Sequence, residues 1–174
     1  MELLMKINLK NAVERVLHVK GNYNGGILEM TLVIDCGLPK EYVSQMAADI
    51  AATLRSHSEV FRNVRLNLLY WWNDEKMENR VVPISFLQMK KCFEEYEPQS
   101  GERTLDMLSD RLKLLHARSK LIIVLADEAM RVCDRDEVNR NMQPFLGRKS
   151  IFFFRNDPDM KWRSWTEGFY GGKS

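Results

Sequence analysis

The chain has 174 residues, with 26 Lys and Arg against 24 Asp and Glu, 45% hydrophobic residues and 29% charged residues. This profile predicts one soluble globular domain over residues 1–174, and it excludes a disordered or collagen-like chain. The three cysteines are too few for a disulfide framework, and no apolar stretch approaches the roughly 20 residues that span a bilayer. We therefore expect a cytoplasmic protein with reduced thiols and no membrane contact.

The first buried strand that the sequence predicts is Ile27–Asp35, a nearly continuous run of aliphatic and β-branched residues. The segment before it has two interpretations. Asn24-Gly25 is the preferred dipeptide of a tight hairpin and favours a strand at Arg15–Lys20, which is the interpretation we adopt. The alternative is a short helix, because five apolar residues fall on one helical face: Leu9, Ala12, Val13, Val16 and Leu17.

A helix is predicted from about Lys40 to Arg55, where apolar residues recur at steps of three and four and Pro39 suits the first turn. Cys36 precedes this helix, where a thiolate would be stabilised, although such a cysteine is more often a small buried hydrophobe. Val64–Trp72 is then predicted as a strand. Arg80–Ile84 is predicted as a shorter strand, at the sheet edge because of Pro83.

Two helices are predicted between this edge strand and the next buried strand. Ser85 can cap the first of them. Its inward face would consist of Phe86, Met89, Phe93 and Tyr96. Thr104 is a natural N-cap for the second. Its core stripe would consist of Leu105, Leu108, Leu112 and Leu115.

Lys120–Ala126 is predicted as a second buried strand, and Ser150–Phe154 as the last one. Between them, Asp134 and Glu137 resemble a capping box. The helix that it opens would bury Val138, Met142 and Phe145, and Gly147 would end it. The alternation of strands and helices predicts a three-layer, Rossmann-like α/β domain, with a mostly parallel central sheet and helices on both faces. Its core would span about residues 14–156, followed by a basic, aromatic tail at 157–174.

Candidate functional residues follow the two buried strands. Asp35 ends the first strand and Asp127, with Glu128, follows the second. Ligands of open parallel sheets bind at the carboxyl ends of the strands, so these carboxylates are expected to face one crevice. Thr104, at the start of the helix before the second of these strands, would point towards it.

Three stretches carry a family resemblance: DCGLP at Asp35–Pro39, SGERTLDML at Ser100–Leu108, and LIIVLADE at Leu121–Glu128. They resemble a von Willebrand factor A domain, whose first strand is central and has parallel neighbours. That family has a metal-binding DxSxS motif after the first strand, a threonine in a later loop and an aspartate after the fourth strand. Here Gly37 and Pro39 replace both serines. The resemblance therefore implies such a domain with a degenerate metal site.

The resemblance implies a non-enzymatic protein-interaction module within a multi-protein assembly, without a cofactor. Its partner would bind in a crevice lined by Asp35, Gly37, Thr104, Asp127 and Glu128. One alternative is an Mg²⁺ site in which Asp35, Thr104 and Asp127 are completed by water. Another is an enzyme, a metal-dependent Rossmann-like hydrolase or phosphotransferase that uses Asp35 and Asp127.

The tail interleaves basic with aromatic residues, a pattern that can hold single-stranded nucleic acid. The net charge of only +2 gives no global field for such binding. Trp162 and Trp165 could instead anchor a protein partner, since tryptophan is enriched at interface hot spots. The simplest interpretation is that these aromatics dock the tail against the domain. The sequence does not specify an oligomeric state.

Overall fold

The computed structural model describes residues 9–12, 14–15, 27–56, 63–89, 91–115, 117–145, 149–157, 159 and 162–164. Its strands are β1 (Ile27–Asp35), β2 (Asn63–Asn73), β3 (Lys76–Val82), β4 (Leu121–Ala126) and β5 (Lys149–Phe154). Its named helices are α2 (Lys40–Arg55), α3 (Leu105–Leu115) and α4 (Arg135–Met142), with short 3-10 helices η1 (Ile84–Gln88) and η2 (Gln143–Phe145).

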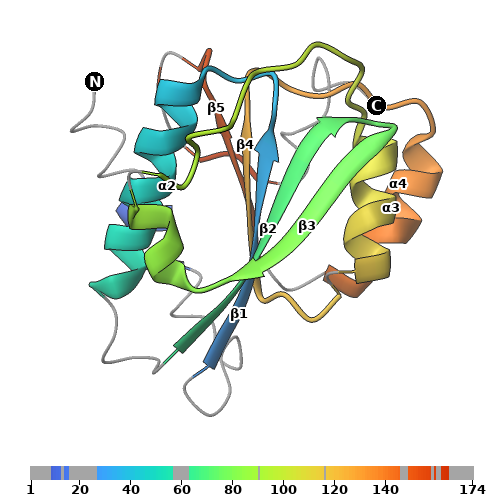
Figure 1. The fold of residues 1–174 in the computed structure, drawn as a ribbon. Coiled ribbons are helices and arrows are strands. Elements are labelled where there is room, and N and C mark those ends of the chain that lie inside the picture. Colours follow the sequence, from blue (N-terminus) through green and yellow to red (C-terminus); the bar gives the residue numbers. More distant parts are fainter. Residues whose placement is uncertain are drawn as a thin grey trace.

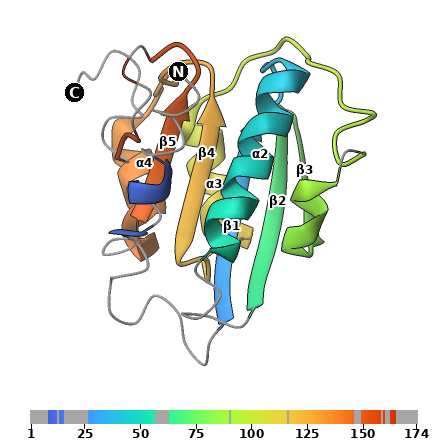
Figure 2. The ribbon, with the colours of Figure 1, turned by 90° about the vertical axis from the view of Figure 1, so that its left-hand side faces the viewer.

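The strands form one five-stranded sheet in the order β3-β2-β1-β4-β5 (Figures 1 and 2). β1 is parallel to both of its neighbours, β2 and β4, and β4 is parallel to β5. Only the β2–β3 hairpin is antiparallel. The predicted α/β fold with a mostly parallel sheet is therefore confirmed, as is an edge strand in this part of the chain. That strand is Lys76–Val82 rather than the predicted Arg80–Ile84, because it ends before Pro83 and Ile84 begins η1.

Alternate residues of the strands enter two apolar clusters, because successive side chains of a strand point to opposite faces. Leu32 and Ile34 of β1 pack with α2, whereas Val33 packs with α3 and α4. Figure 2 shows α2 in front of the sheet and α3 behind it. With both faces covered, β1 and β4 are apolar along nearly their whole length, which is the pattern that identified them in the sequence.

The predicted hairpin at Arg15–Lys20 is wrong where the structure describes it. Arg15 lies in a helical segment that covers residues 9–12 and 14–15. Leu9 and Ala12 of this segment are buried in the cluster on the α2 side. The apolar spacing that favoured a short helix thus determined the local structure, because it places apolar side chains on one helical face that can be buried. Residues 16–26, with the Asn24-Gly25 turn, lie outside the described part.

The helix predicted after Ser85 is also wrong. The chain forms η1, leaves helical geometry at Met89 and makes a separate turn over residues 91–95. Phe93 and Tyr96 are buried as predicted, but Met89 is exposed. No side chain caps η1, which follows Pro83, so nothing local sustains a longer helix.

The starts of the remaining helices follow their predicted signals, but α4 ends at Met142, before the predicted end at Gly147, which lies outside the described residues. α2 has the predicted bounds. Thr104 Oγ1 accepts a hydrogen bond from the N–H of Met107 at 3.3 Å, and Asp134 accepts one from Glu137 N at 3.1 Å. Leu115, predicted for the core stripe, is exposed instead, in the last turn of α3. Among the described residues, no helix has the length and apolar character needed to cross a membrane.

Candidate functional site

The carboxyl ends of the parallel strands meet at one rim of the sheet, which we call the crest together with loops 98–104 and 127–131. Asp35 ends β1, and Asp127 follows β4. Since β1 and β4 are parallel neighbours, their ends lie side by side, and Asp127 N donates to Asp35 Oδ2 at 3.3 Å. Loop 98–104 crosses the end of β1, where Gln99 N donates to the Cys36 carbonyl at 2.7 Å.

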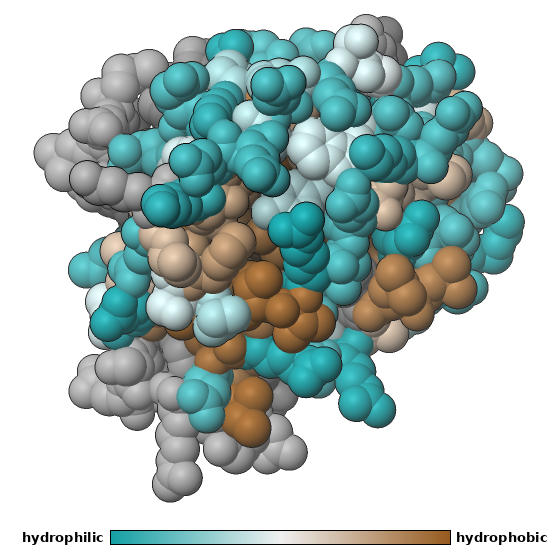
Figure 3. Space-filling view, in the orientation of Figure 1, coloured by the Kyte–Doolittle hydropathy of each residue, from teal (hydrophilic) through white to brown (hydrophobic). Residues whose placement is uncertain are grey.

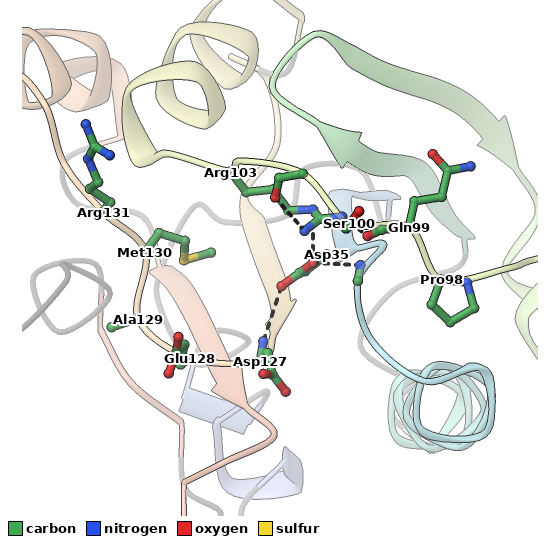
Figure 4. A pocket seen from close by; sticks show the side chains of 12 residues that line it. Asp35, Pro98, Gln99, Ser100, Arg103, Asp127, Glu128, Ala129, Met130 and Arg131 are labelled. Carbon is green, nitrogen blue, oxygen red and sulfur yellow. Dashed lines mark hydrogen bonds and ion pairs between the residues drawn. The ribbon is translucent and has the colours of Figure 1, made fainter.

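A pocket of about 600 Å³ opens between the two crest loops (Figure 4). Four predicted site residues line it: Asp35, Gly37, Asp127 and Glu128. They are joined by the loop residues Ser100 and Arg131, among others, so the lining is mainly polar and contains both signs of charge. The crevice is therefore not simply acidic, although its carboxylates, taken alone from the sequence, suggest an acidic one.

Arg103 is the central cation of the crest, and the sequence analysis did not single it out. Its Nε lies 3.1 Å from Asp35 Oδ1, with only 12% of the arginine and 13% of the aspartate side chain exposed. The guanidinium also donates to four backbone carbonyls at 2.5–3.2 Å, those of Trp71, Trp72, Gln99 and Gly101. A guanidinium offers five N–H groups, so nearly its whole donor capacity is satisfied inside the protein.

Gly37 makes room for this arginine. A Cβ at position 37 would lie 3.0 Å from Arg103 Nη1 and 3.2 Å from Asp35 Oδ1. Its N–H donates to the same Asp35 oxygen at 2.9 Å. Any side chain here, including a serine, would press on the Asp35–Arg103 pair. The absence of the first family serine and the presence of Arg103 are thus physically linked.

Gly101 shapes the loop that delivers Arg103. Its φ of +148° is disfavoured for residues with a side chain, and an added Cβ would lie 2.7 Å from the Cβ of Asn73. The loop can approach the β2–β3 hairpin this closely only with glycine at position 101. This close approach positions loop 98–104 against the hairpin, and the loop in turn places Arg103 beside Asp35.

Thr104 does not point at Asp35. Its hydroxyl donates to Asp74 Oδ2 at 2.9 Å, and its N–H lies 3.0 and 3.1 Å from the two oxygens of the same carboxylate. Asp74 also accepts from Trp71 Nε1 at 3.1 Å. The threonine therefore connects the start of α3 to the β2–β3 hairpin, and the predicted grouping of Asp35, Thr104 and Asp127 does not form.

Asp127 is paired at the outer side of the crest. Its Oδ1 lies 3.3 Å from Arg155 Nε, with 44% of the aspartate and 40% of the arginine side chain exposed. Asn156 Nδ2 donates to its Oδ2 at 3.2 Å. The turn after β5 thus neutralises Asp127, while the neighbouring Glu128 is exposed on the pocket wall.

The alternative Mg²⁺ site of Asp35, Thr104 and Asp127 does not fit these residues. The Asp35 carboxylate already faces a guanidinium, the hydroxyl of Thr104 is directed to Asp74, and Gly37 offers no side-chain oxygen. The described part of the chain contains no group of three or more His, Cys, Asp or Glu side chains arranged to hold an ion. A hard cation needs several oxygen ligands, and the nearest carboxylate here is occupied by a fixed cation.

Cys36 is a buried hydrophobe rather than an activated thiol. Its Sγ donates to the Ile34 carbonyl at 3.4 Å, and the side chain is fully buried. Burial raises the pKa of the Cys36 thiol far above its ordinary value and outweighs the lowering by the Arg103 charge. The geometry therefore favours the buried-hydrophobe interpretation over the thiolate, because desolvation is the largest effect on this thiol.

The described part of the tail packs against the domain. Arg163 and Phe152 of β5 exchange backbone hydrogen bonds at 2.8 and 2.9 Å, and Arg163 also pairs with the buried Asp157 at 2.8 Å. Trp162 packs against the core, and the Arg15 guanidinium lies 5.7 Å from its ring centroid. Trp162 thus fills an internal role, whereas Trp165 lies outside the described residues.

Sequence reasoning did not identify Arg103, Asp74 or Arg155 as partners of the predicted site residues. Each is polar or charged in a loop, and no local pattern distinguishes it from a solvated side chain. The one usable signal was the position of Arg103, directly before the Thr104 cap and two residues after Gly101.

In comparisons with known proteins, no family model, curated protein or solved structure matches this chain.

Proposed function

We propose that this chain is a non-enzymatic protein-interaction module of the von Willebrand factor A type, working in the cytoplasm within a multi-protein assembly. In this proposal the fold is a three-layer Rossmann-like domain, and the partner binds in the crest pocket. The observation that supports it best is the Asp35–Arg103 pair, because the cation facing the first-strand aspartate is part of the chain itself. Partner binding would therefore need no metal ion.

Two further observations support the proposal. The stretches that carry the family resemblance, around Asp35, Arg103 and Asp127, meet at the crest, and β1 lies between two parallel neighbours as in that family. The pocket between them is open and polar, and its walls present the exposed side chains of Glu128 and Ser100. A protein surface of complementary charge suits such a site better than an apolar small molecule.

The enzyme alternative has less support. Asp35 has both oxygens engaged, Oδ1 by Gly37 N and Arg103 and Oδ2 by Asp127 N. Asp127 forms an ion pair with Arg155 through Oδ1, which is buried and has no hydrogen bond, and accepts a hydrogen bond from Asn156 at Oδ2. A nucleophile or general base needs a lone pair directed at the substrate, and here Asp35 would first have to give up its donors and Asp127 its ion pair.

Site-specific photocrosslinking tests the interaction. A photoreactive amino acid at the exposed Ser100, on the pocket wall, should capture a protein in the cells that produce this chain. The matched control probe replaces Lys113, which is exposed on α3 outside the pocket. With the captured protein purified, Glu128→Arg should weaken binding by about tenfold, while Lys113→Glu should not. Identical capture at both positions, or binding indifferent to Glu128→Arg, would reject the pocket as the interaction site.

Two further measurements test the remaining parts of the proposal. Calorimetric titration with Mg²⁺ or Mn²⁺ should show no binding; tight binding that Asp35→Ala abolishes would show that the metal-independent part is wrong. Phosphoester substrates with added divalent ions should not turn over. Metal-dependent turnover that Asp127→Asn abolishes would favour the hydrolase or phosphotransferase instead.

A further inference from the structure

The two edge strands of the sheet, β5 and β3, differ in whether another described segment pairs with their outer side. The outer side of β5 is paired with the tail, through the two backbone hydrogen bonds between Phe152 and Arg163. β3 lies at the other margin (Figure 2), with β2 on one side. None of the described segments pairs with its other side. An uncovered edge strand of this kind presents backbone N–H and C=O groups with which a further strand can pair.

The sequence of β3, KMENRVV, is complementary to itself in an antiparallel arrangement. When Asn79 stands opposite Asn79 of a second copy, Glu78 faces Arg80 and Met77 faces Val81. Two-fold symmetry produces each of these pairs twice. Opposite charges and apolar pairs across strands are the contacts that stabilise antiparallel pairing.

Both charges are held on one face of the sheet. Glu78 Oε1 accepts from Trp72 Nε1 at 3.1 Å, and the Arg80 guanidinium lies 5.5 Å from the centroid of the Tyr70 ring. These contacts restrain the two side chains before any partner arrives. Less side-chain entropy is then lost when they pair across the new interface.

The opposite face contributes the apolar pair. Val81 is 55% exposed, an unusual exposure for a β-branched residue in a strand. Figure 3 views the molecule from the β3 side and shows hydrophobic surface over the lower end of this strand. Met77 packs against the cluster on the side of α3 and α4. In the antiparallel arrangement each Val81 would cover the Met77 of the other copy.

The charge pattern also selects one register. A shift by two residues, which keeps the same faces together, places either Glu78 opposite Glu78 or Arg80 opposite Arg80. Like charges directly opposite each other are destabilising. Only the arrangement centred on Asn79 combines both attractive charge pairs with both apolar pairs.

We propose that β3 is a self-association surface, through which two copies of this chain pair antiparallel about a two-fold axis at Asn79 and join their sheets. The partner strand is β3 of a second copy, because in the antiparallel arrangement the charges of this strand face opposite charges of the same strand in the other copy. This interface is separate from the crest pocket and does not depend on the proposed function.

Sedimentation equilibrium on the full chain tests the charge pairs. The unaltered chain should form dimers as concentration rises, and Arg80→Glu should raise the dimer dissociation constant by about tenfold, because it creates two like-charge pairs. Glu78→Arg combined with Arg80→Glu restores opposite charges across the interface and should recover most of this loss, short of full recovery because the contacts of Glu78 with Trp72 and of Arg80 with Tyr70 are removed. Arg140→Glu, on an exposed position of α4, is the control and should have no effect. Thermal unfolding checks that each variant is folded.

A cysteine at the two-fold axis tests the register. Directly opposed residues of an antiparallel pair have Cα atoms about 4.5–5.5 Å apart, within the span of a disulfide. Asn79→Cys, in a chain with Cys92→Ser and Cys133→Ser, should therefore form a disulfide-linked dimer under mild oxidation, whereas Lys76→Cys should not. A chain that stays monomeric at every concentration, a dimer indifferent to both charge reversals, or equal crosslinking at positions 76 and 79 would overturn the proposal.

Discussion

Asp35 and Asp127 occupy equivalent places in the fold, each at the end of a buried strand, and each pairs with an arginine. Their surroundings differ. The Asp35–Arg103 pair is 12–13% exposed and its guanidinium is held by four backbone carbonyls, whereas the Asp127–Arg155 pair is 40–44% exposed. A buried pair is costly to break, while an exposed pair contributes little. The inner pair therefore fixes the crest, whereas the outer pair contributes little to its stability.

The largest effect is expected from Arg103→Met, which keeps the length of the aliphatic stem but removes the charge. Asp35 would be left without its cation and four carbonyls without a donor, so the free energy of unfolding should fall by about 3 kcal/mol in urea denaturation. Arg131→Met, which breaks a surface pair with Glu102, is the control and should change it by less than about 0.5 kcal/mol. Equal losses in the two variants would remove the distinction between buried and exposed pairs.

A smaller effect is expected from Gly37→Ala. The new Cβ would press on Arg103 Nη1 from 3.0 Å, so the stability should fall by about 1 kcal/mol. In the Arg103→Met background the closest crowding atom is gone and only the 3.2 Å contact with Asp35 Oδ1 remains, so the same substitution should cost less. Chemical denaturation of all four combinations measures this coupling. Additive losses would show that Gly37 is required for another reason.

The smallest effect is expected at the outer pair. Asp127→Asn removes an exposed charge that Arg155 and Asn156 contact, so the stability should change by less than about 1 kcal/mol. The difference between this variant and the unaltered chain should shrink further at high salt, where exposed charges are screened. A loss as large as that of Arg103→Met, or one unaffected by salt, would contradict the comparison between the two pairs.

Much of the fold was predictable from the sequence because its signals are local. The apolar runs of β1 and β4 and the spacing in α2 identify buried elements, and the side chains of Thr104 and Asp134 mark two helix starts. Local signals failed where two structures were compatible with the same residues. At Arg15 the turn chemistry of Asn24-Gly25 suggested a strand, but burial of Leu9 and Ala12 favours a helix.

The site was predictable only in part. The strand ends brought Asp35 and Asp127 together because the sheet is parallel, which the alternation of elements indicated. The partners of these carboxylates come from loops 98–104 and 155–156, whose positions depend on tertiary contacts such as the close approach of Gly101 to Asn73. No local pattern reports such contacts, so the carboxylates at the strand ends were predictable and the arginines that pair with them were not.

The strand order has a consequence for how the chain can be assembled during synthesis. β1 is the first of the five strands, yet its second neighbour, β4, comes about 90 residues later, as the bond between Thr31 and Ser119 at the base of these strands illustrates. Until residues 121–126 have been synthesised, β1, the central strand of the finished sheet, lies at an edge. Until then β1 therefore pairs on one side only, with β2, and its other side is an unpaired apolar edge. The arrival of β4 and β5 turns this margin of a three-stranded sheet into the middle of a five-stranded one.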